Sequence, residues 1–180
     1  MKRIIALILC AVMCVCFISC SNNDTPKAPM GMQYAADPKI TDYILMVPDD
    51  WTIESSTGTT TAYYRDNLSN AVLATFTASF NSPSNPDVTL ENYFESFITE
   101  FKEVFGEPEN VEISNTTLSG EAAKQYVYTA KFGETEYKFW QVVCFRKNII
   151  YTLTYSATEE YYDKYAEDMS LIIDNFSFKK

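Results

Sequence analysis

The clearest pattern in the sequence is a stripe of apolar residues at helical spacing over residues 90–105. Its members recur at intervals of three and four positions, which places them on one face of an amphipathic helix. They are Leu90, Tyr93, Phe94, Phe97, Ile98, Phe101, Val104 and Phe105. Thr89 is the predicted N-cap of this helix, and Gly106 followed by Pro108 is predicted to end it.

A second apolar stripe with the same period lies near the end of the chain. It consists of Tyr162, Tyr165, Ala166, Met169, Ile172, Ile173 and Phe176. Ser156 and Glu159 have the spacing of a capping box, and Thr158 is an alternative N-cap. The sequence therefore predicts a second amphipathic helix in this region.

Elsewhere the period drops to two, which is typical of β-strands. Three strands are predicted at 125–132, 137–145 and 149–155, with joints short enough for hairpins. Earlier strands are predicted at 43–47, 51–53, 59–65 and 72–80, with turns at 66–67 and 81–86.

The later strands carry apolar residues on both alternating faces, as Trp140 and Val142 on one face and Phe139 and Val143 on the other illustrate. A sheet that is apolar on both sides needs cover on both sides, and the two amphipathic helices are available for this. The predicted fold is α+β: an α/β/α sandwich with a central antiparallel sheet flanked by two helices.

The first residues have the three parts of a secretory signal peptide: a basic start, an apolar run at 4–18, and a small residue, Ser19, before Cys20. The tetrad Phe17-Ile18-Ser19-Cys20 resembles the lipobox of bacterial lipoproteins, although Phe17 departs from the usual Leu. This resemblance implies cleavage before Cys20 and a lipid anchor, with palmitate-type acyl chains, on its thiol. An uncleaved membrane anchor and an ordinary signal peptide cut elsewhere are the alternatives.

The predicted organisation follows from this leader. Residues 1–19 form the signal peptide, and 20–42 form the lipidated cysteine and a flexible, Pro-containing linker. Residues 43–180 form the globular domain. The expected location is the extracytoplasmic face of a cell membrane, to which the lipid holds the protein.

Charge and composition restrict the function. The chain has 14 Lys and Arg against 24 Asp and Glu, a net charge of -10, which argues against a nucleic-acid partner. It has no histidine, which excludes a Ser-His-Asp triad and an HExxH zinc site. Beyond the leader only Cys20 and Cys144 remain, so the domain is not a disulfide scaffold.

The segment Val47-Pro48-Asp49-Asp50-Trp51 resembles the opening of the PsbP-like family, and 151–157 with 172–176 resembles its closing strand and helix. The resemblance implies a domain used for binding or assembly, whose relatives bind proteins as different as a photosystem and a nuclear-transport GTPase. It implies no catalytic site.

Each residue that could bind a metal or take part in catalysis also has a simpler, purely structural interpretation. Asp49-Asp50 favours a β-turn over a calcium site, and Glu159-Glu160 favours helix N-terminal charge over a metal site. Glu134 and Glu136 are expected to be solvated. Cys144 favours a core position over a nucleophile, and Tyr63-Tyr64 weakly indicates a partner surface.

The sequence therefore predicts no enzyme, cofactor or metal. The first hypothesis is a lipid-anchored binding module that engages a protein or cell-envelope partner. The alternative is a carrier that holds a small apolar ligand between sheet and helix, next to Phe94, Phe97 and Phe101. A hydrolase is disfavoured because no two carboxylates are placed to face each other.

Overall fold

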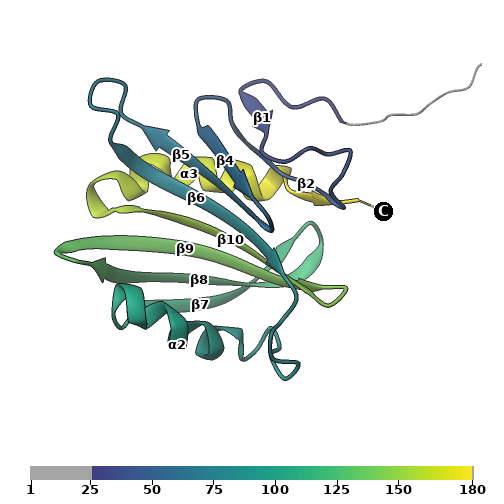
Figure 1. Cartoon of the computed structure of the whole chain (residues 1–180), viewed down its shortest axis with the longest axis vertical. Helices are drawn as coiled ribbons and strands as arrows, with labels where there is room; N and C mark the ends of the chain where they lie inside the picture. The colour runs from purple at the N-terminus through teal and green to yellow at the C-terminus, as the bar shows by residue number, and fades with distance from the viewer. Residues whose placement is uncertain (1–25, 180) are drawn as a thin grey trace, which may run out of the picture.

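The computed structural model describes residues 26–179, so the predicted signal peptide and Cys20 lie outside the described part. A seven-stranded antiparallel sheet dominates it (Figure 1), in the order β4-β5-β6-β10-β9-β8-β7. These strands are β4 (Thr52–Ser56), β5 (Thr59–Arg65), β6 (Val72–Asn81), β7 (Glu109–Leu118), β8 (Glu121–Phe132), β9 (Thr135–Arg146) and β10 (Ile149–Thr158).

The main core lies between one face of this sheet and helix α3 (Glu159–Asn175). The sheet contributes alternate residues of its central strands, and α3 buries Tyr162, Tyr165, Met169 and Ile172. The hydroxyl of Tyr155 on β10 donates a buried hydrogen bond to the main-chain oxygen of Tyr162 at 2.8 Å. This contact fixes the start of α3 against the strand that precedes it.

The opposite face of the sheet carries helix α2 (Tyr93–Phe105). This helix lies beside the β7–β9 side of the sheet (Figure 1), and Phe101 is its only buried side chain. The rest of its apolar stripe is half-buried or exposed, because α2 does not lie flush on the strands. The α2 face of the sheet is thus incompletely covered.

The predicted α/β/α sandwich of the α+β class is therefore wrong. Strands hold 49% of the described residues and helices only 19%. The reason is visible on β6 and β10, whose side chains on the α2 face include Thr75, Thr77, Thr154 and Ser156. Hydroxyl side chains tolerate water, so this part of the sheet needs no covering helix layer.

The segment expected to be linker is partly folded onto the domain. Strand β1 (Met32–Tyr34) pairs with β3 (Met46–Pro48), and β2 (Tyr43–Ile44) pairs with β11 (Ser177–Phe178). The Gln33 amide donates to the main-chain oxygens of Pro48, Asp49 and Trp51 at 3.1, 3.2 and 2.7 Å. The segment from Met32 is therefore paired with and hydrogen-bonded to the strand and turn that precede β4.

The predicted meander is confirmed, with hairpin joints at Gly133 and at Lys147-Asn148. The caps differ from expectation. Helix α2 begins after Asn92, and Thr89 Oγ1 instead accepts a bond from the Asn92 main-chain N–H at 3.3 Å. Thr158, the last residue of β10, is the N-cap of α3, and Ser156 lies two residues earlier inside the strand.

Candidate functional site

A cavity of about 440 Å³ lies where α2 stands off the sheet. We call it the α2 groove. Its lining consists of Thr75, Thr77, Phe97, Phe101, Phe105, Tyr128, Phe132, Tyr137, Phe139, Gln141, Thr154 and Ser156. The volume is within the range of small-molecule sites, roughly 300–1,000 Å³.

Strand register builds the floor of the α2 groove in two rows. Thr75, Ser156 and Phe139 are directly paired across three adjacent strands, and Phe139 is paired with Tyr128. In the next row Thr77 is paired with Thr154, which is paired with Gln141. Each row therefore runs from hydroxyl side chains on β6 and β10 toward larger side chains on β9 and β8.

The aromatic wall of the α2 groove is held by ring contacts between helix and sheet. Phe101 meets Tyr128 edge-on at 5.4 Å and Phe139 at 5.5 Å between ring centroids. Tyr128 and Phe139 stack on each other at 5.0 Å. These distances are those of favourable aromatic pairs, so the wall keeps its shape without a ligand.

Two buried polar atoms of the α2 groove lining lack a hydrogen-bond partner: the Tyr128 hydroxyl and the Gln141 Oε1. Tyr128 is 1% exposed and Gln141 is 2% exposed. The amide nitrogen of Gln141 does have a partner, since it donates to Thr154 Oγ1 at 3.2 Å. Burial raises the pKa of the Tyr128 hydroxyl, so this group keeps its proton and remains a donor.

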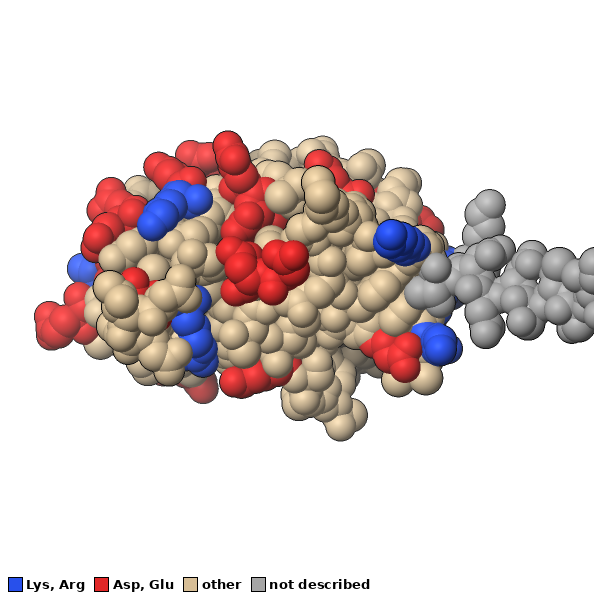
Figure 2. Space-filling model, turned by 90° about the horizontal axis from the view of Figure 1, so that it is seen from above, with Lys and Arg blue, Asp and Glu red and all other residues tan. Residues whose placement is uncertain are grey.

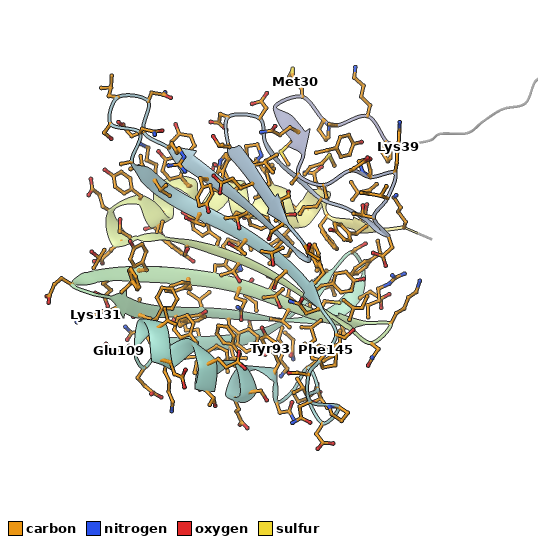
Figure 3. All side chains as sticks on the ribbon, in the orientation of Figure 1. Met30, Lys39, Tyr93, Glu109, Lys131 and Phe145 are labelled. Carbon is orange, nitrogen blue, oxygen red and sulfur yellow. The ribbon has the colours of Figure 1, made fainter. Side chains whose placement is uncertain are left out.

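The two ends of α2 differ in how closely they pack against the rest of the protein. At its start Tyr93 lies close to Phe145 (Figure 3), with ring centroids 6.3 Å apart, and the Tyr93 and Thr152 hydroxyls are 3.4 Å apart. At its end Phe105 meets Phe132, which is 56% exposed. We call the exposed end of the α2 groove, at Phe132, its mouth.

A second cavity, of about 400 Å³, is polar. It is lined by Asn110, Glu112, Val127, Tyr128, Thr129, Glu136, Lys138, Glu159, Tyr162 and Asp163. Glu136 and Glu159, which the sequence presents as unrelated, lie in the same lining. Lys138 Nζ lies 4.4 Å from the Tyr162 ring centroid, a cation–π distance. Within residues 26–179 no three His, Cys, Asp or Glu side chains are grouped to hold a metal.

The other sequence candidates take structural positions. Asp49 and Asp50 form a turn closed by the Trp51 N–H bonding to the Pro48 oxygen at 3.2 Å, as predicted. Cys144 is fully buried in the α3-side core, and desolvation raises its pKa to about 11, which argues against a nucleophile.

Tyr63 and Tyr64, which the sequence indicated as a weak candidate for a partner surface, lie on opposite faces of the sheet. Tyr64 packs on Tyr165 of α3, with ring centroids 4.3 Å apart. Tyr63 lies half-buried on the other face, with the Arg65 guanidinium 5.0 Å from its ring centroid. Neither ring is fully exposed.

Acidic side chains are spread over the face of the molecule that Figure 2 shows, with few basic ones among them. The α2 groove differs from this surface because its lining contains no charged side chain. Among the described helices none has the length and apolarity that crossing a membrane requires.

Sequence reasoning identified Phe97 and Phe101 but missed the polar atoms of the α2 groove. The third ring that it named, Phe94, is outside the lining and stacks on Tyr126 with ring centroids 4.6 Å apart. One signal was available: Gln141 is a polar residue inside the apolar run 139–145. A polar side chain that points inward from a strand usually has a hydrogen-bonding role, and the Gln141 side chain lines the α2 groove. No comparable signal marks Tyr128, because buried tyrosines are common in this chain.

No family model matches the chain, and no curated protein matches its sequence. Solved structures match its fold. The cyanobacterial PsbP protein CyanoP of Synechocystis sp. PCC 6803 has 14% identity and a TM-score of 0.61, over 84% of this chain and 95% of that one.

Two further structures match with lower scores. LpqN, involved in cell envelope biogenesis of Mycobacterium tuberculosis, has 17% identity and a TM-score of 0.53, over 77% of this chain and 83% of that one. The Ran-binding protein Mog1p of Saccharomyces cerevisiae has 6% identity and a TM-score of 0.52, over 76% of this chain and 90% of that one. Identities this low show the fold alone. The chain therefore has a PsbP-like fold, as its sequence motifs indicated.

Proposed function

We propose that this protein is a non-enzymatic binding domain of the bacterial cell envelope, held on the extracytoplasmic face of a membrane by lipid on Cys20. Its binding site is the α2 groove, where it engages a protein or another envelope component. The observation that carries the proposal is the groove itself, which has an uncharged, largely aromatic lining and is exposed at Phe132.

The composition of the lining supports binding over catalysis. Aromatic rings, hydroxyls and one amide offer contact area and hydrogen bonds. Acid–base catalysis needs a titratable group near the substrate with a pKa close to the working pH. The titratable groups of this lining are Tyr128 and Tyr137, and burial moves the pKa of Tyr128 away from neutrality.

The fold and the leader support the location. One structural neighbour, LpqN, is described as involved in cell envelope biogenesis. The leader ends in a lipobox-like tetrad at Cys20. Attachment of more than one acyl chain holds a protein stably on a bilayer.

The anchor is tested by mass spectrometry of the full chain extracted from membranes of its host. We expect a mature N-terminus at Cys20 that carries a diacylglyceryl group. The matched control is Cys20→Ala, which should leave the membrane fraction or remain uncleaved. An intact Met1, or an unmodified Cys20 in the wild-type protein, would contradict the anchor.

The binding site is tested by photo-cross-linking in the host. p-Benzoylphenylalanine replaces Phe132 at the mouth of the α2 groove in the full chain. The control position is Leu171 on α3, which is 47% exposed. We expect a specific adduct from position 132 and none of the same mass from position 171. Equal adducts at both positions, or none at 132, would overturn the groove as the binding site.

A second candidate function is a carrier of a small apolar ligand. The volume of the α2 groove, about 440 Å³, favours it because a space of this size suits a small molecule. The same experiment separates the two candidates. A carrier gives a small mass increase on position 132, whereas a protein partner gives a large cross-linked species.

A further inference from the structure

The α2 groove contains a donor and an acceptor that the folded chain does not use. The Tyr128 hydroxyl and the Gln141 Oε1 are both buried and both without a partner, although both side chains line the cavity. Leaving such a group unpaired is unfavourable, because the hydration that it loses on burial is not replaced. Buried polar groups in native proteins are usually paired, so two in one cavity require an explanation.

The surroundings of these atoms restrict what can pair with them. No charged side chain lines the α2 groove, so a carboxylate or ammonium entering it would lose its hydration without a counter-charge. The rings of Phe101, Phe105 and Phe139 suit an apolar body. The Thr77 and Thr154 hydroxyls offer further hydrogen bonds beside Gln141.

Access requires only a small rearrangement. Both polar atoms are covered in the structure, yet the cover on this face is α2, of which Phe101 is the only buried side chain. The end of α2 nearest Phe132 is the more exposed one, since Val104 is 58% exposed and Phe132 is 56% exposed. Its side chains can therefore turn aside when a ligand enters through the mouth at Phe132.

We infer that the α2 groove binds an uncharged ligand that has an apolar body and a hydroxyl or carboxamide head. This inference rests on the proposed function. The head accepts a hydrogen bond from the Tyr128 hydroxyl and donates one to Gln141 Oε1. The apolar body packs against Phe101, Phe105 and Phe139. The two unpaired atoms are thus reserved for the ligand, at the expense of stability in the free protein.

The test uses three probes of nearly the same shape: 2-naphthamide, 2-naphthoate and 2-acetonaphthone. The amide donates and accepts, the ketone only accepts, and the carboxylate is charged. The full chain is placed in lipid nanodiscs, and the affinity of each probe is measured by the shift of protein NMR signals. We expect 2-naphthamide to bind at least tenfold more tightly than 2-naphthoate and about fivefold more tightly than 2-acetonaphthone.

Three variants locate the head group. Tyr128→Phe and Gln141→Met should each weaken 2-naphthamide binding about fivefold without lowering the melting temperature. Tyr126→Phe is the matched control, because Tyr126 is on the same face of β8 but its hydroxyl donates to the Leu90 oxygen at 3.5 Å and it is outside the lining. This variant should change the affinity by less than about twofold.

The outcomes separate this inference from the proposed function. Equal binding of the amide and the carboxylate, or unchanged affinity in both variants, would overturn the ligand chemistry while leaving the α2 groove as a site. Absence of binding by all probes would overturn it too. The adduct at position 132 then decides independently whether the proposed function stands.

Discussion

Trp51 and Asp168 are 117 positions apart in the chain, yet the indole Nε1 donates a hydrogen bond to Asp168 Oδ2 at 3.0 Å. Trp51 is 2% exposed and follows the Pro48-Asp49-Asp50 turn. The bond therefore ties the turn before β4 to the middle of α3. It gives a structural reason for Trp51 at this point of the chain.

The first prediction concerns the charge of Asp168. Burial raises the pKa of this carboxyl, and Asp50 and Glu167 raise it further, although the Trp51 bond opposes the shift. A raised pKa means that the folded state holds the proton more tightly than the unfolded state. Asp168 therefore favours folding at low pH, and this contribution is lost as the pH rises through the folded-state pKa.

Asp168→Asn removes the charge and keeps an oxygen that accepts from Trp51. We expect the variant to be as stable as the wild-type protein, or up to about 1 kcal/mol more stable, at pH 7, because the group is only partly buried. The gain should shrink at pH 4. Urea unfolding at both pH values measures this, with Trp51→Phe as a control that loses about 1–3 kcal/mol at either pH. A large loss in Asp168→Asn at pH 7 would contradict the prediction.

The second prediction compares two buried tyrosines. Tyr155→Phe removes a buried 2.8 Å bond to the Tyr162 main-chain oxygen, so it should cost about 1–2 kcal/mol of unfolding free energy. Tyr128→Phe removes a hydroxyl that has no partner, so it should cost nothing or stabilise the protein. Thermal unfolding of the two variants measures the difference. Equal losses would mean that Tyr128 does have a partner in the free protein.

The third prediction concerns Cys144. Because burial raises its pKa to about 11, the native protein should resist iodoacetamide at pH 8 and react only when unfolded. Cys144→Ser places a hydroxyl in the α3-side core and should cost about 1–3 kcal/mol. Cys144→Ala should cost less than Cys144→Ser. Rapid labelling of the folded protein would show that the thiol is accessible.

The fourth prediction concerns the segment before Tyr43. Gln33→Leu keeps the bulk of the side chain but removes three hydrogen bonds to the main-chain oxygens around Pro48 and Trp51. We expect a loss of about 1–3 kcal/mol, measured by urea unfolding. Lys27→Ala, at an exposed position before β1, is the control and should have no effect. If Gln33→Leu behaves like the control, the segment is linker after all.

The elements with a strong period were predictable from the sequence. The α2 stripe, the α3 stripe and the hairpins of the meander all lie where their spacing places them. Strand β7 was missed because nearly all its residues are exposed, so burial imposes no alternation on them. Strand β1 was missed because it is three residues long and lies among prolines.

The α2 groove was only half predictable. The ring stripe of Phe97 and Phe101 indicated a space between helix and sheet, since aromatic faces need a partner surface. Its depth depends on how far α2 stands from the strands, which no local pattern records. The wrong sandwich prediction has the same origin: amphipathic spacing shows which face of a helix is apolar but not how much of a sheet it covers.

The central claim, that an envelope component occupies the α2 groove, is tested most directly by filling the groove. Thr77 lines it, whereas Thr61 is its direct partner on β5 and does not. Thr77→Trp and Thr61→Trp are therefore matched insertions on neighbouring strands of one sheet face. In chains with p-benzoylphenylalanine at position 132, we expect Thr77→Trp to reduce the adduct at least tenfold and Thr61→Trp to leave it unchanged. An adduct that survives equally in both variants would contradict the account.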